Sequence, residues 1–358
     1  MMDIYSGPRS DPTAVFCGRL EVVRNDEVHE VINGKYELTF QYPVSGIHFN
    51  SLLPGRHISA PPNAVDPEQL FTIYRIAKPI NGWITVYAQH ISRWLHKCVC
   101  RPFTAENAQT AVQRLELADV GGSMFHFSTD IDAEGEMGFS LPTITADLMG
   151  SGDGCILSVY GGEWEYDGFQ VRLLAQRGKD QGVRIDYGWN MTGYQSDTQR
   201  QDMLDAIYAY YLDQDGNFAE GVTVTAEASA GEEGLTIEPR DYTDQMDRKD
   251  LVLQLLTPVQ KLQRLAEEEL IRIGVFNDGA DKSFRVSFVQ LSKTEEYAGL
   301  AINDGIGMGD TIHVSHAFYG ETAGLRATEI RYQPSTGRYK EVTLGRPSQS
   351  IIKTILKK

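Results

Sequence analysis

The sequence predicts a mostly β protein with smaller α+β insertions. Alternating apolar and polar residues recur along much of the chain, as expected of strands that bury one face. Two of these runs flank Asn33-Gly34 and Asp167-Gly168, dipeptides that favour tight hairpin turns. Glycine (34 residues) and tyrosine (17 residues) are abundant, which fits a β-rich chain with many turns. With 358 residues, the chain has room for two to four domains.

The strongest of these signals surrounds the Asp167-Gly168 turn. Before the turn, Trp164 and Tyr166 alternate with Glu163 and Glu165. Successive side chains of a strand point to opposite faces of its sheet. We therefore expect the two aromatic rings on a buried face and the two carboxylates on a solvated face.

The same segment continues into two further strands. Apolar residues alternate with polar ones over 169–173, which predicts the second strand of a hairpin with a type I′ turn. Gly178 and Gly182 indicate the next turn, and 183–187 follows as a third strand.

The first part of the chain, 1–97, is predicted to be an all-β domain. Asn33-Gly34 predicts a hairpin, and a proline-rich loop follows it over 54–67. Two more strands are expected at 70–76 and 83–89, because both stretches are rich in β-branched and aromatic residues.

Residues 98–182 predict a small α+β domain. Thr104 can cap a helix whose apolar residues recur every three or four positions. These apolar residues are Ala108, Ala111, Val112 and Leu115. A β segment around 124–127 and a short helix near 145–149 are expected before the Asp167-Gly168 hairpin completes the domain.

Residues 183–240 and 298–345 are expected to form a second β domain, because strand-like runs recur in both stretches. Between them, 241–297 is expected to be a helix-containing insertion. It includes a capping box, 257–260, with proline at the first helical position. A single apolar stripe follows and ends near Gly274. Its members are Val259, Leu262, Leu265, Leu270 and Ile273.

The charge of the chain argues against binding to nucleic acid. It has 33 basic and 49 acidic residues, a formal net charge of −16. Affinity for DNA comes largely from lysine and arginine that replace counterions on the phosphates. The basic, amphipathic tail, 346–358, has too few lysines to anchor the chain on a membrane, and we expect it to dock on a partner as a strand or helix.

No secretion signal or membrane helix is expected, because the first residues lack a basic region followed by an apolar stretch. The longest apolar runs are much shorter than the roughly 20 residues that a membrane helix needs. The four cysteines are too few for a disulfide framework at this length. We expect reduced thiols in a protein made in a cytoplasm.

His90, His96, Cys98 and Cys100 form the best candidate metal site, since zinc prefers four nitrogen or sulfur ligands. Two thiols two residues apart on a strand share one face, with no turn to bring them together. No second cysteine pair lies at the spacing of a zinc finger. We therefore expect no metal, and interpret His90 as a helix cap and the thiols as buried.

Three other candidate sites have plainer explanations. A cysteine nucleophile needs an imidazole beside it, and no cysteine here lies in a recognisable local signature. Asp213 and Asp215 resemble the start of a calcium loop, but the twelfth position is Val224, which has no side-chain oxygen. The glycines of 305–309 precede a strand, whereas a dinucleotide loop opens a helix.

Acidic residues are the last candidates for chemistry. Glu163 and Glu165 could suggest the carboxylate pair of a glycosidase, but a solvated strand face explains them better. The three glutamates of 267–269 are expected on the solvated side of the insertion helix. We therefore expect no catalytic, cofactor-binding or metal-binding residues, and no enzyme activity.

Three stretches of the sequence indicate a protein family. The first runs from Tyr160 through Asn190 and includes Arg177-Gly178 and Gly182-Val183. The second spans 70–95, and the third joins Gly309-Asp310-Thr311 to the closing run 336–345. In their order and in their residues, these stretches resemble the hub domain of phage tail proteins, the family also labelled prophage endopeptidase tail or tail-associated lysin.

The resemblance implies a baseplate hub-like fold. Two tail-tube-like β-barrel domains are expected, over 1–97 and over 183–240 with 298–345, with α+β domains at 98–182 and 241–297. It also implies a homotrimer at the tail tip of a virion. The expected partners are the tail tube ring or distal tail protein on one side and a tip, spike or lysin protein on the other, with DNA passing through without specific binding.

Two alternatives remain open on the sequence. One is a peptidoglycan-degrading tail lysin, although the lytic module of this family follows the hub, and this chain stops about where the hub should stop. The other is the hub of a contractile secretion system, which would use the same fold.

Overall fold

The computed structural model describes residues 2–79, 81–152, 154–199, 206–213, 215–225, 237–246, 257–272, 281–297, 302–316 and 321–345. The chain divides into two compact units: unit 1 contains 1–196 and 283–358, and unit 2 contains 197–282. Most regular structure is β and most strand pairs are antiparallel, so the predicted fold class is confirmed at this level.

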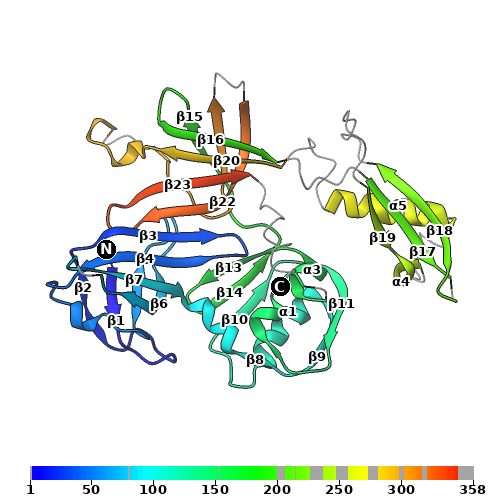
Figure 1. The fold of residues 1–358 in the computed structure, drawn as a ribbon, viewed down its shortest axis with the longest axis horizontal. Helices are drawn as coiled ribbons and strands as arrows, with labels where there is room; N and C mark the ends of the chain where they lie inside the picture. Colours follow the sequence, from blue (N-terminus) through cyan, green and yellow to red (C-terminus); the bar gives the residue numbers. More distant parts are fainter. Residues whose placement is uncertain are drawn as a thin grey trace. The chain divides into compact units, whose positions relative to one another are not determined.

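One sheet of 13 strands dominates unit 1 and contains two sets, which we call the first block and the second block (Figure 1). The strands of the first block are β1 (Met2–Tyr5), β2 (Phe16–Leu20), β3 (Arg24–Val31), β4 (Tyr36–Pro43), β5 (His57–Ala60), β6 (Gln69–Ala77) and β7 (Trp83–His90). The strands of the second block are β15 (Asp180–Asp186), β16 (Met191–Gln199), β20 (Asp281–Phe288), β21 (Thr311–His316), β22 (Glu321–Gln333) and β23 (Arg338–Gly345).

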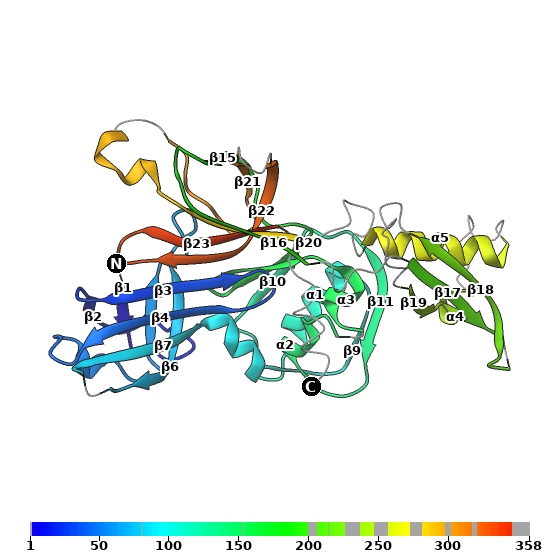
Figure 2. The same ribbon diagram turned by 45° about the horizontal axis from the view of Figure 1, so that its top comes forward.

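Between the blocks in sequence lies an α+β domain (Figure 2). Its helices are α1 (Ala108–Leu117), α2 (Thr145–Leu148) and α3 (Ile156–Tyr160). Its strands are β8 (Val99–Cys100), β9 (Phe103–Asn107), β10 (His126–Thr129), β11 (Glu134–Phe139), β12 (Thr143–Ile144), β13 (Glu163–Asp167) and β14 (Gln170–Leu174). Short 3₁₀ helices in unit 1 are η1 (Phe49–Ser51), η2 (Ile91–Lys97), η4 (Leu291–Lys293) and η5 (Glu295–Tyr297).

The described part of unit 2 contains a three-stranded sheet and two helices. Its elements are β17 (Ala206–Leu212), β18 (Phe218–Thr225), β19 (Ile237–Asp241), α4 (Thr243–Met246) and α5 (Pro258–Arg272). Leu262, Leu265 and Leu270 on α5 share a core with Ile207 and Val224 of the sheet. The predicted apolar stripe is thus confirmed for these three leucines, whereas Val259 is only half-buried. Ile273 and Gly274 lie outside the described residues.

This division differs from the expected domain boundaries. Strands β17 and β18, expected in the second block, belong to unit 2, because α5 covers their apolar residues. Strand β20, expected in the insertion over 241–297, pairs with β23 in the main sheet. Its alternating Phe284, Val286 and Phe288 are buried in the core of the second block.

The two blocks repeat one strand order. Hydrogen-bonded neighbours follow the order β3-β4-β7-β6-β5 in the first block and β16-β20-β23-β22-β21 in the second. The likeness extends to single hydrogen bonds. The Gly55 N–H donates to the Ile73 carbonyl (2.8 Å), and the Gly309 N–H donates to the Ala327 carbonyl (2.9 Å). Both glycines have positive φ angles, +89° and +84°.

The blocks are joined edge to edge, because β22 pairs antiparallel with β3. Among the described strands, no pairing joins β2 to β3 or β15 to β16, so the pairings close neither block into a barrel. In both cases a short connection links the two unpaired strands, over 21–23 and 187–190.

Both predicted hairpins are present. Around Asn33-Gly34, β3 pairs with β4, and Asn33 takes a positive φ of 52°. In the second hairpin, Asp167 lies opposite Gln170, so the two loop residues are Gly168 and Phe169. Only Gly168 has a positive φ, as in a type II′ turn, so the predicted type I′ turn is wrong.

Helix α1 buries the predicted face, but its cap was predicted wrongly. The predicted apolar residues Ala108, Ala111, Val112 and Leu115 are all buried. Thr104 lies within β9, and the side chain of Asn107 accepts the Thr110 N–H (2.9 Å) as the cap. In α5 the predicted capping box is confirmed, since Thr257 and Gln260 exchange side-chain to backbone hydrogen bonds.

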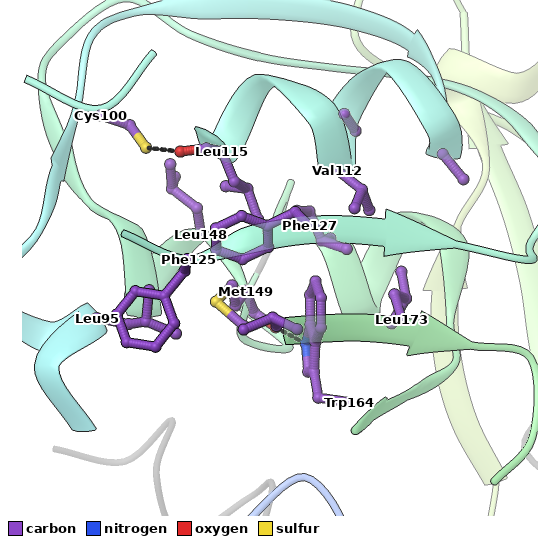
Figure 3. Close-up of a cluster of buried hydrophobic side chains, with 14 of the residues drawn as sticks. Leu95, Cys100, Val112, Leu115, Phe125, Phe127, Leu148, Met149, Trp164 and Leu173 are labelled. Atoms are coloured by element: carbon purple, nitrogen blue, oxygen red, sulfur yellow. Dashed lines mark hydrogen bonds between the residues drawn. The ribbon is translucent and has the colours of Figure 1, made fainter. Parts of the chain in front are cut away.

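The core of the α+β domain contains the hairpin (Figure 3). Trp164 and Leu173 lie opposite each other on β13 and β14, and both are buried. The indole N–H of Trp164 donates to the Met149 carbonyl (2.9 Å). Phe127 from the parallel neighbour β10 and Val112 from α1 belong to the same cluster. Of the two aromatic rings predicted on the buried face of the hairpin, Trp164 is therefore buried, and Tyr166 is half-buried against the same core.

Two remaining expectations concern membranes and disulfides. No helix in the described part of the chain is long and apolar enough to span a membrane. The four cysteines lie within the described residues and form no disulfide.

The pairing of the two blocks includes a charged contact. The Nε2–H of His29 on β3 donates to Glu329 Oε1 on β22 (2.7 Å). This hydrogen bond outweighs the effect of burial and, with help from Arg331, lowers the pKa of Glu329 from 4.5 to about 2. The folded protein therefore binds a proton at Glu329 less readily than the unfolded chain does.

We expect this contact to make the stability of unit 1 depend on pH. Its contribution is complete above about pH 5 and is lost as the pH falls towards 2, because the carboxylate is then protonated. Urea unfolding of the wild type and of Glu329→Gln across this range tests it. The difference between the two should shrink with acid, and a constant difference would contradict the assignment.

Candidate functional site

The hairpin strand β13 carries a buried carboxylate where the sequence predicted a solvated one. Glu163 is only 8% exposed. Its two oxygens accept both terminal nitrogens of the Arg326 guanidinium, each at 2.7 Å, and Oε2 also accepts the Arg177 N–H (2.8 Å). The prediction of a solvated face is therefore wrong for Glu163. Glu165, in contrast, is half-buried and pairs with Arg172 (2.6 Å).

Arg177 extends this contact to the first block. Its Nη1 donates to Glu30 Oε1 on β3 (3.0 Å) and to the Trp164 carbonyl (3.2 Å). Burial raises the pKa of the Glu30 carboxyl, and the Arg177 charge opposes that rise. Arg177 and Glu30 are both nearly inaccessible to water, with side chains 6% and 4% exposed.

The backbone around Arg177 touches a loop of the second block. Gly178 has a φ of +74°, and a Cβ there would lie 2.1 Å from the carbonyl carbon of Gly309. Beside it, the buried Asp310 carboxylate accepts the Lys179 N–H (2.9 Å) and the Gln181 side-chain amide (2.8 Å). Only glycine permits this approach, since a side chain at 178 would overlap the opposite backbone.

Asn33, at the tip of the β3–β4 hairpin, fixes one end of β13. Its Oδ1 accepts the Trp164 N–H (2.7 Å), and its Nδ2 donates to the Gly162 carbonyl (3.0 Å). The neighbouring Ile32 is buried in the core of the second block. The tip of this hairpin therefore contacts both the α+β domain and the second block.

Gln69, at the start of β6, fixes the other end of β13. Its Oε1 accepts the Gly168 N–H (2.9 Å), and its Nε2 donates to Asp167 Oδ1 (3.1 Å). Oε1 also lies 3.2 Å from Nε2 of the buried His90. Since Nδ1 of His90 accepts the Ser92 N–H, the ring proton lies on Nε2 and donates to Gln69.

The environment of His90 keeps its ring neutral. Burial first, and then the positive charge of Arg177, lower the pKa of His90 to about 3. The ring stacks on Tyr36, with centroids 4.3 Å apart. His90 also caps the 3₁₀ helix η2 through the Ser92 N–H, which confirms the predicted capping role.

We call this set of polar contacts, most of whose members are buried, the junction. Its members are Glu30, Asn33, Gln69, Glu163, Arg177, Asp310 and Arg326. They come from the first block, the α+β domain and the second block. Glu163, Arg177 and Asp310 belong to the stretches that resemble phage tail hub proteins, and Gln69 directly adjoins one of them. Chemically the junction is a set of hydrogen bonds and ion pairs, in which Nε of Arg177 is buried without a hydrogen-bond partner. It can fix the three parts of unit 1 to one another.

Two further contacts support the joining of the blocks. The Tyr339 hydroxyl donates to the Ile306 carbonyl (2.7 Å) and accepts the Ala64 N–H from the first block (3.2 Å). The fully buried Asp26 on β3 accepts the Ser335 N–H and hydroxyl, both at 2.6 Å.

The four candidate metal ligands have other partners. His90 binds Gln69 and Ser92, as described, and His96 lies 2.7 Å from the Arg93 guanidinium. The Cys98 thiol contacts the Trp94 carbonyl, and the Cys100 thiol contacts the Leu115 carbonyl and the Thr145 hydroxyl. Among the described residues, no three His, Cys, Asp or Glu side chains gather so that they could hold a metal ion.

The other candidate residues have structural surroundings. Burial raises the pKa of the Cys98 and Cys100 thiols, which disfavours the thiolate that a nucleophile needs. Asp213 Oδ1 accepts two backbone N–H groups of its own turn, from Asp215 and Asn217. The glycines of 305–309 precede β21, as the sequence predicted.

The acidic run of α5 and the basic tail complete the comparison with the sequence. Glu269, expected on the solvated side, accepts a hydrogen bond from the Tyr242 hydroxyl, and its side chain is only 17% exposed. The prediction is therefore wrong for Glu269. The tail, 346–358, lies outside the described residues.

Sequence reasoning missed most of the junction. Glu30 left a signal, because it alternates with Val28 and Ile32 and so falls on the face that both bury. A charged residue at such a position predicts a buried partner. Arg177 and Arg326 left no comparable signal, since the first lies in a glycine-rich turn and the second in a run with few large apolar residues.

The sequence matches no family model, and no curated protein matches it. Solved structures, in contrast, match nearly the whole chain. The prophage tail protein gp18 of Listeria monocytogenes EGD-e is 14% identical, with 99% of this chain and 97% of that chain covered and a TM-score of 0.58. The 43 kDa tail protein of prophage MuSo2 from Shewanella oneidensis is 10% identical, with coverage of 97% and 96% and a TM-score of 0.60.

A tail protein of Neisseria meningitidis MC58 matches equally well, with 10% identity, 96% of both chains covered and a TM-score of 0.59. The chain has the fold of phage tail proteins. The resemblance that the three stretches suggested is therefore confirmed for the fold. In this tail-protein fold, the stretches meet at the junction.

We expect the junction to be essential to the stability of unit 1. Glu163→Gln should lower the free energy of unfolding by about 3 kcal/mol, because Arg326 then loses its buried counter-charge. Glu165→Gln, two residues along the same strand, is the matched control and should cost about 0–1 kcal/mol, since its ion pair is partly exposed. Chemical denaturation measures both, and equal effects would contradict the role of Glu163.

Proposed function

We propose that this chain is the structural hub of a phage or prophage tail tip or baseplate. Three copies form a ring that joins the tail tube to the tip or spike and surrounds the DNA channel. The observation that supports this most directly is the likeness to three tail proteins over at least 96% of this chain. The neighbours carry the fold from end to end, so the match is not that of a single shared domain.

The repeated strand order supports a ring that fits a tube. Two blocks of one topology in each chain give six similar blocks in a trimer. We propose that each block acts as a tail-tube-like barrel domain, with its short connection closing the gap that hydrogen bonds leave open. Such a ring has approximate sixfold symmetry, which suits a hexameric tube.

The function proposed for unit 1 is to provide a rigid frame. The junction fixes the α+β domain between the blocks through charges that are costly to separate once buried. A part that carries load between a tube and a spike needs fixed relative positions of its domains. The buried contacts of Glu163, Arg177 and Asp310 suit that requirement.

The charge suits a channel through which DNA moves. Three chains carry 3 × −16 = −48 formal charges. A strongly acidic ring repels the phosphates, so DNA could pass without binding. The proposed location is the virion, after synthesis in the bacterial cytoplasm. The proposed partners are the tail tube ring or distal tail protein, and a tip, spike or lysin protein.

The proposal predicts a trimer without lytic activity. Light scattering of the purified protein should give a mass near 120 kDa, three times 40.0 kDa, at sufficient concentration. A zymogram on purified bacterial cell walls should show no clearing by this chain alone. Clearing would favour a tail lysin, and a dimeric or persistently monomeric protein would contradict the ring.

A further inference from the structure

The contact between the two blocks has an equivalent pair of strands that does not form within a single chain. Within the chain, β3 of the first block pairs with β22 of the second. By the shared strand order, β3 corresponds to β16, and β22 corresponds to β6. The equivalent pair, β16 with β6, is not formed within one chain, since the described part of the sheet places these strands apart.

The correspondence of β6 and β22 extends to their irregularities. Against β7, the register of β6 shifts between Ile73 and Arg75. Against β23, the register of β22 shifts between Ala327 and Glu329. Each shift marks a bulge immediately after the residue that bonds the positive-φ glycine. Arg75 therefore corresponds to Glu329.

The two strands differ in what lies beyond the bulge. On one edge, β22 pairs with β21 as far as Arg326 and with β3 from Glu329 onward. On the equivalent edge, β6 pairs with β5 as far as Thr72. From Tyr74 to Ala77 that edge of β6 has no partner among the described strands.

The free edge of β6 has the features of an interface. Tyr74 is 46% exposed and Arg75 is exposed, whereas the preceding residues alternate between buried and half-buried. Strand β16 offers the second open edge, because it is the terminal strand of the described sheet and pairs there only with β20. Open edges invite pairing with another chain, and neither edge carries a proline to prevent it.

We propose that β16 of one copy pairs with the 74–77 edge of β6 in a second copy, as β3 pairs with β22 inside the chain. The partner is another copy of this chain, because the chain already contains one example of the same contact. The two edges belong to different strands, so the contact is head to tail and can close a ring. The inference specifies the subunit contact of the ring proposed above and rests on that proposal.

The backbone N–H of Ile76 is the position at which a substitution tests this pairing most directly. Ile73 directs its N–H and carbonyl to the β5 side, where Arg56 and Gly55 bond them. Strand alternation past the bulge directs the amide of Ile76 to the same side. Its counterpart, Ile330, lies opposite Glu30 in the internal contact.

The test is the association of full-length Ile76→Pro, measured by light scattering over a dilution series. We expect association on the order of a hundredfold weaker than in the wild type, because proline removes the donor and clashes with a paired strand. Glu136→Pro, in the bulge of edge strand β11, is the matched control and should associate normally. Circular dichroism checks that all three proteins fold.

Hydrogen exchange of the wild type tests the contact without a variant. Amides of 74–78 and of 191–199 should exchange at least tenfold more slowly in the assembled protein than in the dilute monomer. Unchanged exchange, or normal association of folded Ile76→Pro, would overturn this pairing and leave the ring standing. A wild type that stays monomeric at every concentration would overturn both proposals.

Discussion

The arrangement of unit 1 depends on the burial of one carboxylate. A buried Glu163 cannot lose its partners without leaving an uncompensated charge in a medium that solvates it poorly. Its partners come from β22 and from the turn after β14, and Arg177 in that turn holds Glu30 of the first block. Hydrophobic packing alone tolerates small shifts between domains. A bidentate contact between a carboxylate and a guanidinium does not tolerate such shifts, because its hydrogen bonds are directional.

The repeated strand order explains how the rest of the chain is accommodated. In the first block, strands β3 and β4 are joined by a tight turn whose Asn33 reaches β13. At the corresponding place in the second block, between β16 and β20, the chain inserts the whole of unit 2. Connections at the ends of strands tolerate insertions, because the pairing of the strands is unaffected. The same connection therefore has two different uses. In the first block it is a tight turn that binds β13, and in the second block it is the site at which unit 2 is inserted.

Local features of the structure could be predicted from the sequence, and long-range features could not. The hairpin around Gly168, the buried face of α1 and the capping box at Thr257 each depend on residues within a few positions. Alternation also placed Glu163 correctly on the face opposite Trp164. It could not show that this face is covered too, because the partner, Arg326, is 163 positions away. The boundary of unit 2 was missed for a similar reason, since β17 and β18 form a sheet with the distant β19 and pack on α5 instead of joining the second block.

The central claim is that Glu163 and Arg326 act as one unit that fixes the α+β domain to the second block. A double-mutant cycle measures this directly, with Glu163→Gln, Arg326→Gln and the double variant compared by chemical denaturation of the full chain. We predict a coupling energy of about 2 kcal/mol, because each single change leaves the other partner unsatisfied. Effects that add within about 0.5 kcal/mol would show that the two residues act independently, and would contradict the account.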